Sequence, residues 1–572
     1  MENVKKYVLK FKFHILLLGI SLFIASQFMK STLIYTHDGF THFWRILSTY
    51  QEIQKNGRLP IIITRLCNGW GYAPNLFYNP LTTYIPCVFA IFTNNFILAV
   101  KLFLCCNIFI TAELVYLFSK KISKNENIGF ISAVIYILNP YYLGEFFIRG
   151  AAGEIAALTF LPLLFLGLYN LVEEDGKKHI YIIVGTVGIA LSHNITLVFA
   201  AIFSGLYLLF NIKLVIKKYK QLIKYCSIDL LFIVLLTAFY TVPLYLNKTN
   251  TDYAIFNSKY MYTNNEFAEE NAIKTNELFE NIEERMVICK IGWPIIIGCT
   301  LLLIFGVEID KKKLKTIIIF AILGFIGIFM STEYFPWGKV PEALCILQFP
   351  WRLLGFAYLF LSICAAYGMI TFVELIFKSK KIVIFISLLI ISILSMVYAF
   401  KYSGIKIKDK ENDEYFESYY TNYENEINYE MIVKDYLPVK AFKKMFTYLP
   451  YRDSETVSVI KGRTEIFKQK KDGLKMEIEL KPVYDETIIE FPYLYYLGYE
   501  AKITETGGKE YKSEVIESEN GFVAVRIKNK EIEKIVVEYK TPILYKIAYI
   551  VSIVSFVCGL GIIIHNRLKM KK

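Results

Sequence analysis

The chain has 572 residues, of which 55% are hydrophobic and 16% aromatic, which is more apolar material than soluble domains of this length would bury. Apolar runs recur at about 20 residues, the length of a helix that crosses roughly 30 Å of hydrocarbon. The formal net charge of +13 comes mostly from short lysine clusters between these runs, as in cytoplasmic loops. Composition therefore excludes a soluble enzyme, gives no support for a nucleic-acid partner and predicts a multi-pass membrane protein.

About twelve apolar runs are predicted to cross the membrane as helices. They lie near 13–30, 97–119, 127–143, 153–172, 178–192, 194–212, 225–246, 288–306, 314–331, 353–377, 381–400 and 544–566. A shorter run at 81–93 contains Pro86, so we expect a helix at the outer interface there. The first run follows a lysine-rich segment, as in a signal peptide, but no small-residue cleavage site comes after the run. We therefore expect an uncleaved first helix.

The lysine clusters also predict the orientation. With the N-terminus in the cytoplasm, the clusters between helices and the basic C-terminal tail fall on the cytoplasmic side of the cell membrane, as the positive-inside rule requires. The outer face then receives 31–96, 144–152, 247–287, 332–352 and 401–543. Both termini are therefore expected to be cytoplasmic.

Three parts follow along the chain. Residues 1–400 form a predicted all-α membrane domain with its first outer loop at 31–96, and 543–572 form a last helix with a cytoplasmic tail. Between them, 401–542 contains no cysteine, and from Thr456 its short β-type runs alternate with glycine-containing turns. This pattern predicts an extracytoplasmic β-sandwich-like domain before the last helix.

Arginine marks the predicted outer face. Only ten of the 64 basic residues are arginine, and the predicted cytoplasmic clusters consist almost entirely of lysine. The arginines on the outer side of the membrane domain are Arg45, Arg58, Arg65, Arg149, Arg285 and Arg352. Because the planar guanidinium suits phosphate, we infer an anionic ligand there. The alternative is that these side chains reach headgroups or pair with nearby acids.

The densest candidate site begins directly after the first helix, in the sequence "HDGFTHFWR". It holds His37, Asp38, His42 and Arg45 within nine residues. If 39–55 is helical, His42 and Arg45 share a face. Asp38 could cap that helix or, as a general base, take a proton from an acceptor hydroxyl. His37, Asp38 and His42 could also ligate a metal, although this spacing is a weak signal.

Three further motifs carry ionisable residues on the predicted outer side. They supply Glu145, Arg149 and Glu154 ("GEFFIRGAAGE"), His193 ("LSHN") and Arg352 ("QFPWRLLGF"). Glu154 enters the next predicted span, where an ionisable group is a functional candidate, although a plain Glu–Arg pair is the alternative. Trp351 fits an aromatic belt at the interface. No P-loop, GxSxG or HExxH motif is present, so the chemistry of those motifs is not indicated.

The motifs "HDGFTH", "IRGAAGE", "LSHN" and "QFPWRLLGF", with "YLYYLGYEAKI" in the outer segment, resemble one bacterial membrane-protein family. This family is labelled 6-pyruvoyl-tetrahydropterin synthase-related, a label that does not imply pterin chemistry. The chain is also similar to membrane glycosyltransferases that decorate lipoteichoic acid, and through them to the C-type (GT-C) glycosyltransferase superfamily. The resemblance spans nearly the whole chain and is strongest over 31–210 and 340–360.

The resemblance implies a sugar donor carried on a polyprenyl phosphate and a glycan or polymer acceptor in the cell envelope. Asp38 occupies the place of the superfamily's general base, although it stands alone where a paired acidic motif is usual. Glu145 or Glu154 would be the second acid. Arg149 or Arg352 would lie near the lipid phosphate, with Arg45 and Arg58 as weaker choices. Some relatives use such acids with a divalent cation, which makes a cation a possible cofactor here.

The sequence therefore predicts a GT-C-type membrane glycosyltransferase with Asp38 as its base. Its predicted substrate-binding residues are His37, His42, Arg45, Glu145, Arg149, Glu154, His193 and Arg352. One alternative is a non-catalytic polyprenyl-phosphate transporter or flippase, although no internal repeat of the kind that alternating access favours is detected. Another is an envelope-assembly scaffold that holds glycan through Tyr419, Tyr420 and Tyr423.

Overall fold

The computed structural model describes residues 2–29, 33–34, 36–280, 286–377, 380–402, 435–484 and 486–571. The chain divides into two compact units. The helical unit consists of 1–47, 79–234 and 263–421, and the sheet unit consists of 48–78, 235–262 and 422–572. Arg285, Tyr419, Tyr420 and Tyr423 lie outside the described residues.

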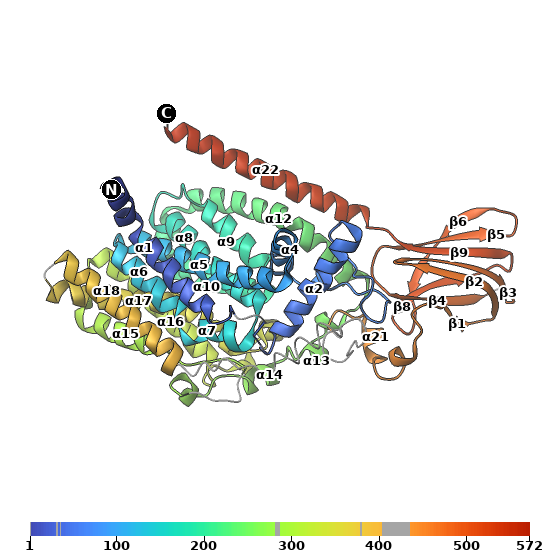
Figure 1. The fold of residues 1–572 in the computed structure, drawn as a ribbon, viewed down its shortest axis with the longest axis horizontal. Coiled ribbons are helices and arrows are strands. Elements are labelled where there is room, and N and C mark those ends of the chain that lie inside the picture. The colour runs from blue at the N-terminus through green and yellow to red at the C-terminus, as the bar shows by residue number, and fades with distance from the viewer. Residues whose placement is uncertain are drawn as a thin grey trace. The chain divides into compact units, whose positions relative to one another are not determined.

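The helical unit is a bundle of apolar helices (Figure 1). Its principal helices are α1 (Glu2–Ser26), α4 (Leu81–Thr93), α5 (Phe96–Ser123), α6 (Glu126–Ile137), α7 (Pro140–Gly144), α8 (Ala152–Glu173), α9 (Ile180–Ala190), α10 (Asn194–Phe210), α15 (Trp293–Phe305), α16 (Lys311–Ser331), α17 (Leu354–Ile376) and α18 (Lys381–Val397). Shorter helices are the π-helix η1 (Glu145–Arg149), α11 (Ile212–Lys217) and α14 (Asn265–Glu270). Helices α2 (Gly39–Asn56) and α12 (Tyr219–Asn250) contain boundaries between the two units.

Small residues bring the helices of this bundle into close contact. Helix α17 packs against α15, α16 and α6. At Gly368, an added Cβ atom would lie 2.0 Å from the carbonyl oxygen of Gly298 on α15, so only glycine allows this approach. Among the helices long enough to span a membrane, α8 is the most enclosed: 94% of its most apolar stretch is buried inside the protein. The core of the unit therefore lies around α8 and α17.

Every predicted apolar run is helical, but not every helix is long enough to span a bilayer. Among the described residues, seven helices are long and apolar enough, and the bent pair 126–137 and 140–149 would make an eighth. Helices α9, α10 and α15 are shorter. Helix α9 has 11 residues and is only about 16 Å long, too short to cross alone. The prediction of about twelve crossings thus exceeds what these helix lengths support, because α9, α10 and α15 are each shorter than the apolar run that contains them.

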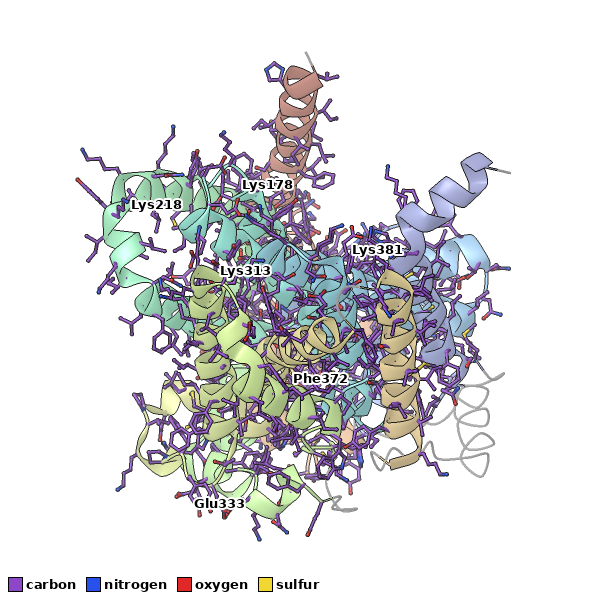
Figure 2. All side chains as sticks on the ribbon, turned by 90° about the vertical axis from the view of Figure 1, so that its left-hand side faces the viewer. Lys178, Lys218, Lys313, Glu333, Phe372 and Lys381 are labelled. Carbon is purple, nitrogen blue, oxygen red and sulfur yellow. The ribbon has the colours of Figure 1, made fainter. Side chains whose placement is uncertain are left out.

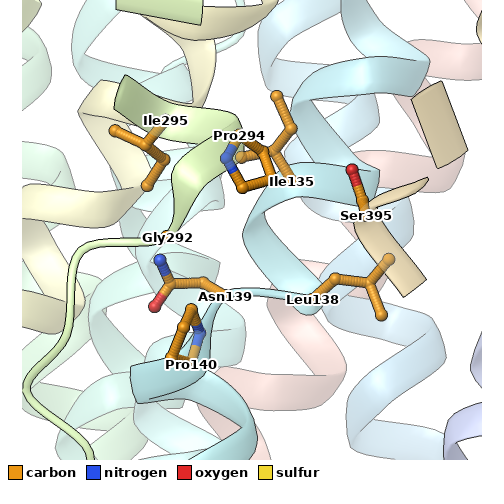
Figure 3. A pocket seen from close by; sticks show the side chains of 8 residues that line it. All are labelled: Ile135, Leu138, Asn139, Pro140, Gly292, Pro294, Ile295 and Ser395. Carbon is orange, nitrogen blue, oxygen red and sulfur yellow. The ribbon is translucent and has the colours of Figure 1, made fainter. Parts of the chain in front are cut away.

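The bend between α6 and α7 measures 44° and follows from Pro140, which has no N–H to continue the helix. Asn139, just before it, accepts a hydrogen bond from the Tyr141 N–H at 2.9 Å and so caps α7. A hollow at this bend is lined by Asn139, Pro140, Pro294 and Ser395 among others (Figure 3). It leaves no room for a water molecule, so it is a packing defect and not a ligand site.

Lysines from four of the predicted cytoplasmic clusters lie toward the same end of the helical unit. Figure 2 shows Lys178, Lys218, Lys313 and Lys381 in the upper half of the unit and Glu333 at the opposite end. This separation is what the lysine pattern of the sequence predicts for helices that cross a membrane in alternating directions. Which end faces the cytoplasm stays a prediction.

The sheet unit contains two antiparallel sheets, which confirms the predicted β-rich domain before the last helix (Figure 1). One sheet has the order β1 (Ser458–Lys461), β4 (Thr487–Leu494), β8 (Phe522–Ile527), β7 (Val515–Glu517). The other has the order β2 (Thr464–Asp472), β3 (Lys475–Pro482), β9 (Ile532–Tyr539), β5 (Tyr499–Glu505), β6 (Glu510–Ser513). Alternate residues of β3 (Met476, Ile478, Leu480) are buried, as a half-buried strand requires.

Other segments complete the sheet unit. Short helices here are α3 (Pro74–Phe77), α13 (Ser258–Met261) and α21 (Val439–Lys443). The last helix, α22 (Ile543–Lys571), pairs with the end of α12, where Ser552 donates to the Leu235 carbonyl at 2.8 Å. Residues 57–78 of the first predicted outer loop also belong here: the Leu494 N–H donates to the Trp70 carbonyl, and the Trp70 ring meets Phe522 edge-on. The start of that loop, up to 47, and its last part, from 79, belong to the helical unit.

We expect Gly368→Ala to lower the free energy of unfolding by about 1–3 kcal/mol, because the new methyl group meets a backbone carbonyl that cannot turn aside. Thermal unfolding in detergent measures the effect. Gly205→Ala on α10 is the matched control, since a Cβ there meets nothing within 4 Å. That control should be neutral or stabilising by up to about 1 kcal/mol. Equal effects of the two substitutions would contradict the packing argument.

Candidate functional site

Two of the motifs meet through their backbones. The N–H groups of His37 and Asp38 donate to the carbonyls of Ile148 and Arg149, at 3.0 and 2.6 Å. Glycine makes this possible, because a Cβ at Gly150 would lie 2.1 Å from Thr36 Oγ1. Gly150 also has a φ of +69°, which favours glycine. The glycines of "HDG" and "IRG" thus fix Asp38 beside Arg149.

Arg149 is the centre of the site. Its Nε lies 3.0 Å from Asp38 Oδ2, and its Nη1 lies 3.1 Å from Glu145 Oε2 and 2.6 Å from Glu154 Oε2. We call Asp38, Glu145 and Glu154 the carboxylate cluster. Arg149, Glu145 and Glu154 are buried, whereas the Asp38 side chain is 38% exposed. Asp38 therefore pairs its charge with Arg149 and still presents carboxylate surface outward.

Glu154 connects this centre to a second arginine. It accepts a hydrogen bond from the Tyr141 hydroxyl at 2.6 Å, and its Oε2 lies 3.4 Å from Arg352 Nε. The Trp351 ring lies under Arg149, with 4.6 Å between the guanidinium carbon and the ring centre. Trp351 is buried, so the expected place in an exposed aromatic belt is wrong: it packs against the site.

The guanidinium of Arg352 is only partly engaged in hydrogen bonds with the protein. Its Nη1 donates to the Leu347 carbonyl at 2.7 Å and to Gln348 Oε1 at 3.3 Å. Its Nε has no hydrogen-bond acceptor among the described residues and faces Glu154 only as an ion pair. The side chain is 10% exposed. A buried arginine with an unused N–H is suited to bind an anion.

The predicted helix after Asp38 is present as α2, and His42 and Arg45 share a face of it. Arg45 Nη2 donates to His42 Nδ1 at 3.0 Å, and Arg45 Nε donates to Thr83 Oγ1. Burial, followed by the charges of Arg45 and Arg149, lowers the pKa of His42 well below its usual value. Because arginine can only donate, His42 is neutral and carries its proton on Nε2.

His193 begins α10 as its N-cap. Its Nδ1 accepts from the Thr196 N–H at 3.4 Å and lies 2.8 Å from Thr196 Oγ1. Burial lowers the pKa of His193 to about 3, with Arg352 and Arg149 adding to the decrease and Glu154 opposing it. The next residue, Asn194, accepts a hydrogen bond from Asn79 at 2.8 Å, which ties this turn to the start of α4.

The structure thus joins most of the predicted site residues. Asp38, Glu145, Arg149, Glu154 and Arg352 form one continuous ion-pair network. His42 pairs with Arg45, and His193 lies near enough to Glu154 for that carboxylate to oppose the decrease in the His193 pKa. His37 is exposed and joins the site through its backbone.

Sequence reasoning missed Tyr141 and Thr83. Tyr141 directly follows Pro140, which breaks the helix at the end of an apolar run. That break was the one feature of the sequence that could have indicated a turn bringing Tyr141 near Glu154. Thr83 carried no signal, because a lone threonine in an apolar run is common. Among the described residues, no group of three or more His, Cys, Asp and Glu has an arrangement that could hold a metal ion.

This bundle of apolar helices with a polar network at one set of helix ends defines an integral membrane protein. Residues 76–403 match the family described as "6-pyruvoyl-tetrahydropterin synthase related domain; membrane protein". The match covers more than half of the chain, which therefore belongs to this family.

Two further similarities are found. An uncharacterized protein of Lactococcus lactis subsp. cremoris (strain MG1363) is 28% identical over 271 residues, which make up 46% of this chain and 43% of that protein. The alignment thus spans less than half of the relative. The crystal structure of the Archaeoglobus fulgidus oligosaccharyltransferase, in complex with Zn and sulfate, aligns at 13% identity with a TM-score of 0.41, covering 76% of this chain and 59% of that one.

We expect the free energy of unfolding to fall as the pH drops from about 6.5, the ordinary pKa of histidine, toward the His193 pKa of about 3. In that window the unfolded chain binds a proton at His193 that the folded chain does not bind. His193→Asn keeps an N-cap residue and should reduce this slope by up to about 1.4 kcal/mol per pH unit. Chemical unfolding in detergent at pH 4–7 measures it. An identical slope in the variant would contradict a neutral, buried His193.

Proposed function

We propose that this protein is a membrane glycosyltransferase that moves a sugar from a polyprenyl-phosphate donor to a hydroxyl group of a cell-envelope acceptor. We place the reaction at the outer face of the membrane. The observation that carries the proposal is the network Asp38–Arg149–Glu154–Arg352, in which a partly exposed carboxylate and an anion-binding guanidinium share one buried support.

Arg352 is the better candidate for the lipid phosphate. Its Nε donates no hydrogen bond among the described residues, so a phosphate oxygen could accept from it. Arg149 is less suited, because three carboxylates already engage its Nε and Nη1. Arg45 is committed to His42 and Thr83. In this proposal Arg149 pairs with the acids of the site, and Arg352 binds an external anion.

The proposed reaction is a single displacement. A carboxylate oxygen of Asp38 takes the proton of the acceptor hydroxyl, whose oxygen forms a bond to the anomeric carbon of the sugar. The bond from that carbon to the phosphate oxygen breaks, and the polyprenyl phosphate leaves with the electron pair. Arg352 stabilises the negative charge that develops on this leaving group. One displacement inverts the anomeric configuration.

The position of the polar groups favours an enzyme over a transporter. Arg149 ends η1, Glu154 lies in the first turn of α8, and Arg352 precedes α17. All three therefore lie at helix ends, whereas transporter sites typically lie near the middle of the bilayer. An interface site suits a lipid-borne donor, which can enter sideways from the membrane.

We expect Asp38→Asn to bind the donor and to transfer sugar about 10²- to 10⁴-fold more slowly, because an amide cannot accept the acceptor's proton. Proteoliposomes supplied with radiolabelled polyprenyl-phosphate sugars measure transfer. Asp175→Asn, at an exposed loop aspartate, is the matched control and should transfer normally. Full activity of Asp38→Asn would exclude Asp38 as the base.

We expect Arg352→Ala to weaken binding of polyprenyl phosphate by about 10- to 100-fold, the effect of losing charge-assisted hydrogen bonds. Arg352→Lys should recover only part of the affinity, since lysine keeps the charge but not the fork. Binding to the purified protein in detergent is the measurement, and Arg463→Ala, at an exposed arginine, is the control. Unchanged affinity in Arg352→Ala would rule out this phosphate site. Arg352-dependent binding without transfer by the wild type would indicate a carrier instead.

A further inference from the structure

The carboxylate cluster encloses a guanidinium. Asp38, Glu145 and Glu154 come from the start of α2, from η1 and from the first turn of α8, and all three contact Arg149 within 3.1 Å. Three acids gathered around one point are the usual setting for a divalent cation, which prefers carboxylate oxygens. A divalent cation in a GT-C-type site would be expected to use such acids.

The residues do not fit a divalent cation in this arrangement. The Arg149 guanidinium lies between the carboxylates, and a metal ion beside it would meet a fixed positive charge at short range. Neither His42 nor His193 offers a nitrogen atom that could bind a metal ion. His42 Nδ1 accepts from Arg45, His193 Nδ1 accepts from the Thr196 N–H, and in both rings the other nitrogen then carries the proton.

We propose that Arg149 is the resident cation of this site: its guanidinium takes the place of a divalent metal ion between Asp38, Glu145 and Glu154. The role of Arg149 in sugar transfer rests on the proposed function. The statement that Arg149 occupies the place of a metal ion does not depend on it. The chain would therefore hold and orient Asp38 with its own side chain, and transfer would need no added metal.

The charges of the network agree with this assignment. The carboxylate cluster brings three acidic groups together, and Arg149 and Arg352 are the two cations that contact them, while His42 is neutral. Without Arg149, three carboxylates would share one neighbouring arginine, and two of them are buried. Mutually repelling buried acids either take up protons or bind another cation. Removal of Arg149 should therefore create a metal site where the wild type has none.

The decisive variant is Arg149→Met, which removes the charge and keeps much of the volume. With full-length protein in detergent and Mn²⁺ as the probe, we expect this variant to unfold at a lower temperature than the wild type. Mn²⁺ should then raise its thermal midpoint by about 3 °C or more, and spectroscopy should detect one bound ion per chain. The wild type should bind no Mn²⁺ in the cluster and should keep its transfer rate after EDTA treatment.

Arg452→Met in the sheet unit is the matched control. Arg452 is also buried and also faces a buried acid, with its Nε 3.2 Å from Glu490 Oε1, but it faces only one. This variant should be destabilised and should gain nothing from Mn²⁺. If Arg149→Met does not fold, Arg149→Met combined with Glu145→Gln relieves the repulsion and should still bind Mn²⁺ through Asp38 and Glu154.

Two results would overturn the inference. One is Mn²⁺ binding by the wild type that Asp38→Asn weakens, or transfer that EDTA abolishes and Mn²⁺ restores. The other is a folded Arg149→Met variant that takes up no Mn²⁺. Absence of sugar transfer with every donor would count against the proposed function alone, because the Mn²⁺ measurements decide the cation question without turnover.

Discussion

The contact of one buried guanidinium with three carboxylates holds the polar part of the helical unit together. Arg149 reaches Asp38, Glu145 and Glu154, which belong to three different elements. Removing one partner from such a network leaves an unpaired buried charge, which costs far more than an exposed ion pair contributes. The glycine contact at Gly150 and the cation–π contact with Trp351 both serve this arrangement, since each brings a neighbour within reach of Arg149.

The network distinguishes two roles for arginine that the sequence alone did not distinguish: pairing with the protein's own acids and binding an external anion. Arg149 is enclosed by acids, whereas Arg352 has an N–H group without an acceptor among the described residues. Glu154 touches both and so sets their spacing. The proposed base Asp38 and the proposed anion site at Arg352 share one support, which would limit how far either must move when substrates bind.

Much of the fold could be predicted from the sequence, because long apolar runs and alternating β-type runs report burial directly. Hydropathy placed the break after 192, close to the observed end of α9 at Ala190, but it did not show that this helix of 11 residues is too short to cross a bilayer alone. Strand β2 shows little alternation in the sequence, because Lys468, Lys470 and Lys471 interrupt it, and it forms by pairing with β3. The sequence predicted only that the motifs of Asp38 and Arg149 lie on the same side of the membrane. It could not predict their contact, because the two residues are 111 positions apart in the chain. The catalytic roles of these residues stay predictions.

The spacing within the network also bears on how the protein is made. Glu145, Arg149 and Glu154 lie within ten residues of one another, so two of the three acid contacts form inside a single stretch of chain. A charged group costs several kcal/mol in hydrocarbon unless it is paired. During synthesis this stretch can therefore enter the membrane with its arginine already paired, before residues made much earlier or later arrive. Asp38 and Arg352 then join a preassembled centre, and insertion does not have to wait for the whole bundle.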